Sequence, residues 1–402
     1  MAMRHALVML GVVSALCLVG CRAASTSTSQ STRRAAASDA TSVSPPVSLT
    51  PEPTPTCLPA QGAPPGPELE DLAFADAADV WAGRSLYVAG CQGATRDAGQ
   101  VMASTDGGAT WTEQYHGPVV PDVMQFVDDV HGWVAGCKAQ DDGYQTCTSA
   151  LLSTSDGGAT WRTVATYGAS RITQVDFVSP LDGWVLMESC QPQCGRGNAQ
   201  LIATLDAGAS WHDLSLPETM DPFALQRSGA MHGWVLGLHQ LFITDDAGAT
   251  WRTVSAPGGD VLDFVDAQHG WLGGAGGDGG GMAAKEIDAT SDGGNTWRPV
   301  AESYYGSVTP QAGIGNLSLD GGGTALSFLD PLDGWLATEG RASFLFYTND
   351  GGHTWQGVAS GTPPSTIDQI AFANASDGWA WGNSYLIHTT DGGAQWSQIA
   401  IP

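Results

Sequence analysis

Short apolar runs of the strand type recur from residue 71 to residue 402, and each run is bounded by turn residues. One of them, Leu201-Ile202-Ala203-Thr204, stands directly before the turn that begins at Asp206. Such runs predict β-strands of a few residues each. Residues 1–70 lack this pattern, so the folded part of the chain is expected to begin near residue 71.

One turn motif follows these runs and reads Ser/Thr-x-Asp-x-Gly-x-Thr-Trp in most copies. The carboxylate and the hydroxyl of this motif can accept hydrogen bonds from backbone N–H groups inside a tight turn. The glycine permits a positive φ. We expect these aspartates to be structural. The motif occurs seven times, at Asp106, Asp156, Asp206, Asp246, Asp292, Asp350 and Asp391.

A second motif alternates with the first and places a Phe seven residues before the Trp of a Gly-Trp pair, which in the first repeat is Val80-Trp81. In the fourth repeat Arg227 occupies the Phe position ahead of Trp234, and Trp381 belongs to neither motif. Each repeat therefore predicts four strands: A on the Phe, B on Gly-Trp, C leading into the Asp turn and D leading out. The Phe/Trp pairs of the other repeats are Phe74/Trp81, Phe126/Trp133, Phe177/Trp184, Phe264/Trp271, Phe328/Trp335 and Phe372/Trp379.

With these two motifs the chain resembles the Asp-box, or bacterial neuraminidase repeat (BNR), propellers. Within that group it is most similar to photosystem II assembly-factor-like proteins. The resemblance covers residues 71–402 and implies an all-β, seven-bladed β-propeller with four-stranded blades. An open β-solenoid is the alternative. Because the chain opens on a strand A and ends on a strand D, no strand exchange is evident to close the ring.

The N-terminus predicts export and lipid attachment. An apolar stretch from Ala6 to Val19 is too short to cross a bilayer and is typical of a signal peptide. It leads into Leu18-Val19-Gly20-Cys21, which resembles the lipobox of bacterial lipoproteins. The resemblance implies residues 1–20 as signal peptide and Cys21 as the lipidated residue. An ordinary signal peptide with a chance cysteine is the alternative.

Residues 21–70 are rich in Ser, Thr, Ala and Pro and cannot bury a core, so they predict a disordered tether. The expected location is the extracytoplasmic side of the cell envelope, with the lipid as membrane anchor. A net charge of −26, from 41 acidic and 15 basic residues, argues against a nucleic-acid partner.

The cysteine positions predict disulfides in an oxidising compartment. Cys137 and Cys147 flank one B–C loop, and Cys190 and Cys194 lie in the next. Cys91 occupies the comparable position in the first repeat. Cys57 of the tether is then the remaining cysteine, and we expect it to pair with Cys91.

Loop length varies on only one rim of the expected propeller. The separation between a Gly-Trp and the following Asp-box Trp, across the B–C loop, ranges from 17 (Trp234 to Trp251) to 30 (Trp81 to Trp111). The Asp box itself keeps its length. Variable loops on a rigid scaffold favour a binding rim. Insertions there include 92–100, 138–148, 191–200 and 302–324, and we take Tyr144, Tyr304 and Tyr305 as candidate ligand-contacting residues.

We expect a non-catalytic binding or assembly module, monomeric, whose partner is a protein or a glycan at the cell surface. The alternative is a glycoside hydrolase of the sialidase-like propeller type. Sialidases need three converging arginines, whereas Arg162, Arg252 and Arg298 follow Asp-box tryptophans on separate repeats. Two carboxylates in the mouth of the variable rim would favour a hydrolase.

No cofactor is expected, and no metal site. His131, His232 and His269 precede Gly-Trp where other repeats have Asp, which indicates a turn position. Asp141-Asp142-Gly143 lacks the rest of a calcium-binding loop.

The lipoprotein hypothesis predicts that Cys21→Ala blocks both lipid attachment and cleavage before residue 21. Radiolabelled palmitate should label the wild type and leave the variant unlabelled, because the thiol that takes the diacylglyceryl group is gone. Equal labelling of the two proteins, or labelling of neither, would refute the assignment.

Overall fold

The structure is a computed structural model that describes residues 66–90, 93–139, 146–190, 199–217, 222–237, 240–275, 285–303, 324–338, 344–358, 367–382 and 385–402. Every regular element in these ranges is a β-strand. Among the same residues there is no helical segment of the length and hydropathy that a membrane crossing requires. Cys21, Cys57, Cys91, Cys194, Tyr144, Tyr304 and Tyr305 lie outside the described residues.

Within the described ranges, consecutive strands pair antiparallel in groups of four, which we number as blades in chain order; the second and third groups are joined in one eight-stranded sheet. Blade 1 contains β1 (Glu68–Phe74), β2 (Val80–Gly90), β3 (Gly93–Ser104) and β4 (Thr112–Gly117). Blade 2 contains β5 (Val123–Phe126), β6 (Gly132–Cys137), β7 (Thr148–Thr154) and β8 (Arg162–Gly168). Blade 3 contains β9 (Ser170–Phe177), β10 (Gly183–Ser189), β11 (Ala199–Thr204) and β12 (His212–Asp213). Blade 4 contains β13 (Ala224–Ser228), β14 (His232–Leu236), β15 (Gln240–Thr244) and β16 (Arg252–Ser255).

The remaining blades follow the same order. Blade 5 contains β17 (Val261–Phe264), β18 (Gly270–Ala275), β19 (Lys285–Thr290) and β20 (Arg298–Ser303). Blade 6 contains β21 (Thr324–Phe328), β22 (Gly334–Thr338), β23 (Phe344–Thr348) and β24 (Gln356–Gly357). Blade 7 contains β25 (Gln369–Phe372), β26 (Gly378–Gly382), β27 (Tyr385–Thr389) and β28 (Ser397–Ile399).

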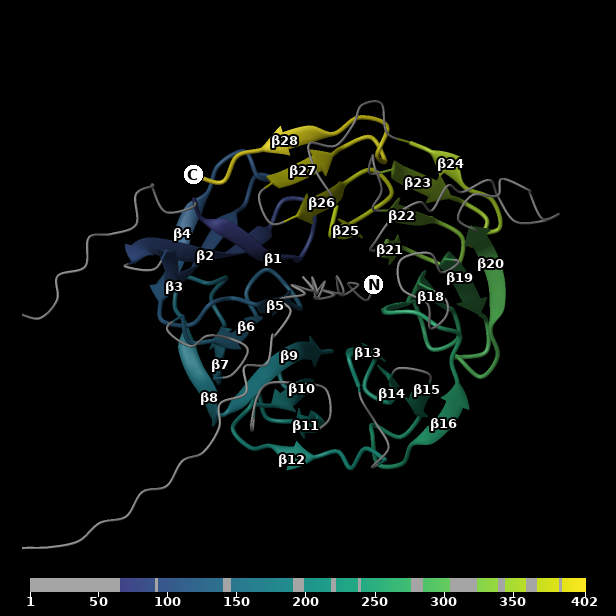
Figure 1. The fold of residues 1–402 in the computed structure, drawn as a ribbon, viewed down its shortest axis with the longest axis horizontal. Helices are drawn as coiled ribbons and strands as arrows, with labels where there is room; N and C mark the ends of the chain where they lie inside the picture. Colours follow the sequence, from purple (N-terminus) through teal and green to yellow (C-terminus); the bar gives the residue numbers. More distant parts are fainter. Residues whose placement is uncertain are drawn as a thin grey trace, which may run out of the picture.

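The blades form a ring, which makes the chain a β-propeller. The first strand of each blade lies nearest the centre of the ring and the fourth lies outermost (Figure 1). Blades 2 and 3 are joined more closely than a propeller requires, because Thr148 of β7 pairs with Ser170 of β9 in a parallel bridge. The first strand starts at Glu68, three residues ahead of the boundary expected at residue 71.

The two sequence motifs meet at the contacts between blades. The Gly-Trp ring of one blade stacks on the inner-strand Phe of the next, as Trp81 does on Phe126 at 3.6 Å and 7°. The same stack occurs as Trp133–Phe177, Trp234–Phe264, Trp271–Phe328 and Trp335–Phe372. Asp-box tryptophans then meet the Phe ring edge-on, as Trp161 meets Phe126. All seven Gly-Trp rings are buried, whereas the Asp-box tryptophans are only half-buried.

Arg227 replaces the missing Phe between blades 3 and 4. Its guanidinium lies 4.3 Å from the Trp184 ring centroid, so a cation–π contact takes the place of the aromatic stack. Two hydrogen bonds to the Asp182 carboxylate, at 2.8 and 3.1 Å, compensate its charge. The Arg227 side chain is therefore buried together with an opposite charge, which a buried cation needs.

Inner strands are also linked by a polar side chain placed directly before the Phe position. Gln125 accepts a hydrogen bond from the Phe177 N–H, and Asp263 accepts one from the Phe328 N–H, both at 2.6 Å. The equivalent residues Asp176, Gln226 and Ser327 bind the next inner strand in the same way. These bonds satisfy strand-edge N–H groups that the ring leaves without a partner in their own sheet.

The Asp boxes adopt nearly the same geometry in every blade. In the first, Asp106 accepts bonds from the Thr110 N–H and hydroxyl and from the Ser104 hydroxyl at 2.7–2.8 Å. These bonds lower the pKa of Asp106 to about 2. Both residues after the aspartate have positive φ, including Ala207 and Ala247, which stand where the other boxes have Gly. The sequence had indicated positive φ only for the second of these positions.

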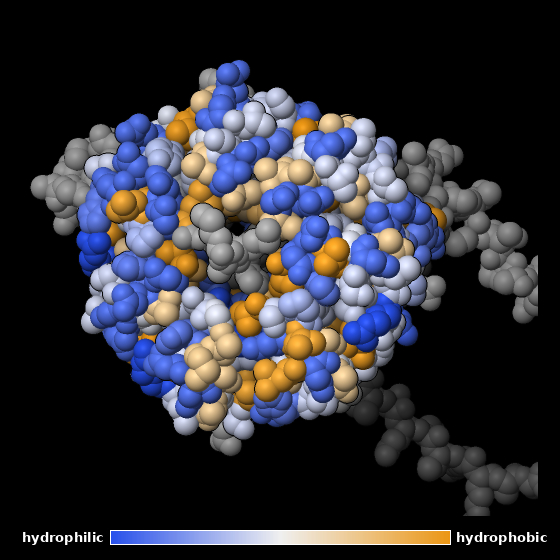
Figure 2. Space-filling view, turned by 180° about the vertical axis from the view of Figure 1, so that it is seen from behind, coloured by the Kyte–Doolittle hydropathy of each residue, from blue (hydrophilic) through white to orange (hydrophobic). Residues whose placement is uncertain are grey.

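Two rims are thus defined. The A–B turns and Asp boxes share one rim, since a box N–H donates to the A–B turn in each blade, as Gly107 does to Ala78. We call this the Asp-box rim, and the opposite one, where the inner strands begin, the variable rim. Figure 2 shows one end of the ring, where hydrophobic residues form separate groups among hydrophilic ones.

Side-chain packing closes the ring between blades 7 and 1. Trp379, Trp381 and Leu386 pack with Leu72, Phe74 and other residues of blade 1 in one buried cluster. Arg84 donates to the backbone carbonyls of Ile401 and Pro402 at 3.2 and 2.7 Å. Each described blade keeps its own four strands, so no strand is exchanged across this seam. Trp381, the tryptophan outside both motifs, has its role here.

Arg227 supports a stability prediction. Arg227→Ala should lower the free energy of unfolding by about 3 kcal/mol, because it leaves Asp182 unpaired and the Trp184 face uncovered. Arg227→Phe should cost about 1 kcal/mol less than Arg227→Ala, since its ring covers the Trp184 face as Phe372 covers Trp335, although Asp182 loses its partner in both variants. Urea unfolding of both variants tests this, and equal destabilisation of the two would contradict it.

Candidate functional site

A cluster of charged side chains lies on the variable rim where blades 1 and 2 meet. Arg96 of β3 is its centre: its Nη2 lies 2.9 Å from Glu70 Oε1, and its Nη1 lies 3.7 Å from Asp122 Oδ1. The Tyr87 hydroxyl beside it donates to Glu68 at 2.7 Å. We call Glu68, Glu70, Tyr87, Arg96 and Asp122 the rim cluster.

Irregular strand pairing directs these side chains. The β1–β2 register shifts between Leu69 and Asp71, which makes Glu70 the extra residue of a β-bulge. The β2–β3 register shifts between Leu86 and Tyr87, and Asp97 is the extra residue there. Bulges re-aim side chains and are frequent beside functional sites. The two bulges bring Glu70 and Arg96 together from strands that do not pair with each other.

Burial dominates the electrostatics of this cluster. It raises the pKa of Glu70, although the Arg96 guanidinium opposes the shift. It also raises the pKa of Asp122, against the favourable charges of Arg171 and Arg96. Asp71, fully buried below them, has its pKa raised well above the usual range, while its carboxylate accepts the N–H groups of Met124 and Leu72. Charged groups are therefore held on this rim at a desolvation cost, which is more common at functional sites than elsewhere.

A disulfide fixes the position of Asp122. Cys137 and Cys147 form the disulfide expected from their loop position, with Cα atoms 5.3 Å apart. The Cys137 N–H donates to Asp122 Oδ2 at 3.2 Å. Cys190 packs against this pair and is itself disulfide-bonded, to a residue outside the described ranges.

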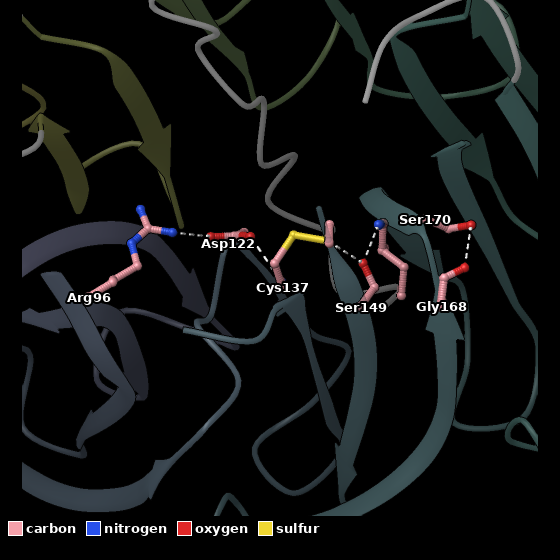
Figure 3. The surroundings of a disulfide bond; sticks show 8 residues. Arg96, Asp122, Cys137, Ser149, Gly168 and Ser170 are labelled. Atoms are coloured by element: carbon pink, nitrogen blue, oxygen red, sulfur yellow. Dashed lines mark hydrogen bonds and ion pairs between the residues drawn. A yellow bond between two sulfur atoms is a disulfide. The ribbon is translucent and has the colours of Figure 1, made fainter. Parts of the chain in front are cut away.

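From the disulfide, a chain of hydrogen bonds continues into blade 3. Cys147 Sγ lies 3.3 Å from the Ser149 hydroxyl, which accepts the Ile172 N–H at 2.9 Å (Figure 3). The Ser170 N–H donates to the Cys147 carbonyl at 3.1 Å. Arg96 of blade 1 is thus connected through Asp122 and the disulfide of blade 2 to β9 of blade 3. The rim of blades 1 to 3 is a cross-linked surface.

No sequence motif marks the rim cluster. Arg96 lies within the insertion 92–100 that varying loop length had indicated, but nothing in the sequence pairs it with Glu70 or Asp122. The seven Asp-box aspartates lie on the opposite rim, hydrogen-bonded within their own turns. Arg162, Arg252 and Arg298 begin the outer strands of three different blades.

The three turn histidines contact aspartates and not each other. His131 Nδ1 lies 2.9 Å from Asp128, His269 Nδ1 lies 2.9 Å from Asp266, and His232 Nδ1 lies 3.0 Å from Asp245. Within the described ranges no three His, Cys, Asp or Glu side chains are grouped so that they could hold a metal ion.

Comparison with known proteins supports a BNR-type propeller. A family profile described as "Photosynthesis system II assembly factor YCF48" matches residues 315–402. No curated protein matches the chain by sequence. The C-terminal match and the ring of four-stranded blades agree on the propeller fold.

Solved structures agree with this fold. One titled "YCF48 bound to D1 peptide" superposes with a TM-score of 0.55 at 18% identity, over 82% of this chain and 95% of that one. YCF48 from Cyanidioschyzon merolae gives 0.52 at 15% identity, over 82% and 97%. The GH74 xyloglucanase from Xanthomonas campestris gives 0.55 at 16% identity, and 83% of this chain covers 55% of that enzyme.

The disulfide network yields a stability prediction. Replacing Cys137 and Cys147 together by Ala should lower the free energy of unfolding by about 2–3 kcal/mol, the range for a loop of this length. Amide exchange at Ile172 should accelerate, because the Ser149 hydroxyl that binds its N–H loses its neighbour. Exchange at Leu386, on the far side of the ring, serves as the control. Unchanged exchange at Ile172 would contradict the proposed coupling of blades 2 and 3.

Proposed function

We propose that this chain is a non-catalytic, lipid-anchored binding or assembly propeller that takes a protein partner on the variable rim of blades 1 to 3. One observation carries the proposal: charged side chains are held on that rim by two bulges and a disulfide network, at a cost in desolvation. A surface built to be rigid and charged suits recognition of a partner, because preorganised groups lose little entropy on binding.

The matches to YCF48 proteins support this choice of partner class. One of those proteins is described as bound to a peptide. The acidic character of the present chain, with a net charge of −26, favours a partner with basic segments and raises the rate of their encounter. We propose Tyr144, between β6 and β7 of blade 2, as a further contact residue of this surface, and Tyr304 and Tyr305, between blades 5 and 6, as contacts beyond blades 1 to 3.

The remaining features of the proposal concern the whole chain. Seven blades complete the ring, residues 1–20 are a signal peptide, and Cys21 carries the lipid. Residues 21–70 tether the propeller on the extracytoplasmic side of the membrane, as a monomer. The disulfide pairs Cys190–Cys194 and Cys57–Cys91 complete the framework of which Cys137–Cys147 is a part.

A glycoside hydrolase is the second candidate, because Glu70 and Asp122 place two carboxyl groups on the variable rim. Their environment argues against catalysis. Arg96 interacts with both carboxylates, and the Asp122 side chain, 6% exposed, also accepts the Cys137 N–H. A catalytic pair must leave room for a sugar between its two members, whereas Arg96 interacts with both of these carboxyl groups.

Site-specific photo-crosslinking in intact cell envelopes tests the proposal. A photoreactive residue at position 97 would sample the variable rim, and one at position 105, beyond the other end of the same strand, would sample the Asp-box rim. Both positions are exposed. We expect a discrete protein adduct from position 97 that is absent from position 105, and a several-fold weaker adduct when Arg96→Ala is added.

Two outcomes would overturn the proposal. An adduct formed only from position 105 would place the partner on the Asp-box rim, contrary to the proposal. Release of reducing sugar from xyloglucan or a sialoside, lost in Glu70→Gln or Asp122→Asn, would favour the hydrolase. The variant Arg171→Ala serves as a further probe, because Arg171 adds positive charge near Asp122.

A further inference from the structure

A cavity of about 580 Å³ opens on the Asp-box rim between blades 6 and 7, away from the rim cluster. Its walls include Trp335 and Tyr347 of blade 6, Gly357 and Val358 at the end of that blade, and Asp391 and Gly392 of the seventh Asp box. The volume is in the range of small-ligand sites. Comparison of the repeats shows why an opening forms here.

Tyr347 is the first departure from the repeat pattern. It pairs across the sheet with Trp335, and its ring lies 5.1 Å from the indole at an angle of 44°. The equivalent residue is smaller and not aromatic in blades 1 to 5. Those residues are Ala103, Ser153, Ala203, Ile243 and Ala289. At this position, blade 6 therefore carries a large aromatic ring that blades 1 to 5 lack. The equivalent residue of the neighbouring blade 7 is His388.

Gly357 is the second departure. It pairs with Phe346 in the outer strand, where the other blades carry a side chain. A Cβ added at Gly357 would have nothing within 4 Å, so this position leaves open space. The residues at the equivalent position elsewhere are Glu113, Thr163, Asp213, Thr253, Pro299 and Gln398.

The third departure is in the Asp box. In six boxes the second carboxylate oxygen accepts a hydroxyl hydrogen bond, as Asp350 does from Thr354 at 2.6 Å. In the seventh, Gln395 replaces that Thr or Ser. The Gln395 N–H and the Thr389 hydroxyl still bind Asp391 Oδ1, and the Gln395 N–H is the main cause of its lowered pKa. The Gln395 side chain also hydrogen-bonds this carboxylate, so Asp391 is an ionised group on the cavity wall that an amide contacts in place of the usual hydroxyl.

Tyr347 remains a neutral ring beside a second carboxylate. Its hydroxyl donates to Asp333, and burial together with that bond raises the pKa of Tyr347 to about 12. A ring in this state presents a negative π face without carrying charge of its own. Val358 adds an apolar wall.

We propose that this cavity binds an organic ammonium group, supplied either by a free quaternary amine or by a lysine side chain of a partner. The Tyr347 ring provides a cation–π surface, Asp391 provides the counter-charge, and Val358 and Ala375 cover the alkyl part. The strongly acidic chain raises the local concentration of such cations. The site lies on the rim opposite the proposed partner surface and is independent of it.

Isothermal titration of the full chain with two cations tests the proposal. Choline represents a free quaternary amine, and Nα-acetyl-lysine methylamide represents a lysine side chain. The uncharged choline analogue 3,3-dimethylbutan-1-ol is the ligand control. We expect binding of one or both cations and at least about tenfold weaker binding of the neutral analogue, since the cation–π and ion-pair contacts are lost.

Two substitutions locate the binding. Gly357→Thr installs the residue that blades 2 and 4 carry and should fill the opening. Tyr347→Leu keeps an apolar side chain but removes the π face. Each should weaken cation binding about tenfold or more, with circular dichroism confirming the fold. Gly168→Thr is the matched control, because a Cβ at Gly168, in the outer strand of blade 2, also meets nothing within 4 Å. It should bind as the wild type does.

The outcomes separate the sources of the ligand. Choline binding alone indicates a free amine, and binding of the lysine derivative alone indicates a partner side chain. Binding of neither cation, equal binding of the neutral analogue, or unchanged affinity in Gly357→Thr and Tyr347→Leu would each overturn the proposal. None of these outcomes depends on the protein partner of the variable rim.

Discussion

The contact between the Gly-Trp ring of one blade and the inner strand of the next holds the propeller together. The indole stacks on a Phe, and its Nε1 donates to the Asp-box carbonyl of the neighbouring blade, as Trp81 does to Gly157 at 3.0 Å. One side chain therefore links an inner strand to a rim turn across a blade boundary. The Asp box must keep a constant shape, because its carbonyl has to lie within hydrogen-bond distance of the indole Nε1 of the neighbouring blade. This requirement explains why the Asp-box rim is uniform while the opposite rim varies.

Three seams depart from this combination of a Trp–Phe stack and an indole hydrogen bond. Between blades 3 and 4, Arg227 replaces the ring and brings Asp182 as its counter-ion. Trp133 Nε1 has no hydrogen-bond partner among the described residues, and the Asp box it faces carries Ala207 in place of the first Gly. Between blades 7 and 1, Trp379 stacks on His388 of its own blade at 3.9 Å. The ring tolerates each exception because the other seams keep the full set of contacts.

Much of the fold could be predicted from the sequence, since its determinants are local. Each Asp box contains its own hydrogen-bond partners within seven residues, and each Phe stands at a fixed distance from Gly-Trp. The pairing of Cys137 with Cys147 followed from their positions at the two ends of one loop. The rim cluster could not be predicted. Glu70 and Arg96 come from two strands that do not pair with each other, and Asp122 directly precedes a third. No motif predicts the two β-bulges that bring Glu70 and Arg96 together. The cavity beside Tyr347 depends on the absence of a side chain at Gly357, which acquires meaning only when the blades are compared in register.

Among the described residues the ring is closed by side-chain packing, and no strand is shared between blades 7 and 1. This has a consequence for how such a chain can change over time. Each described blade is encoded by one uninterrupted stretch of sequence, from an inner strand to an outer one. Duplication or loss of one such stretch would add or remove a whole blade without leaving half of a sheet behind. Propellers that share a strand between the first and last blades lack this freedom, because their termini belong to the same sheet. Differences such as Arg227 and Gly357 are likewise confined to single blades and leave the strand order of the others unchanged.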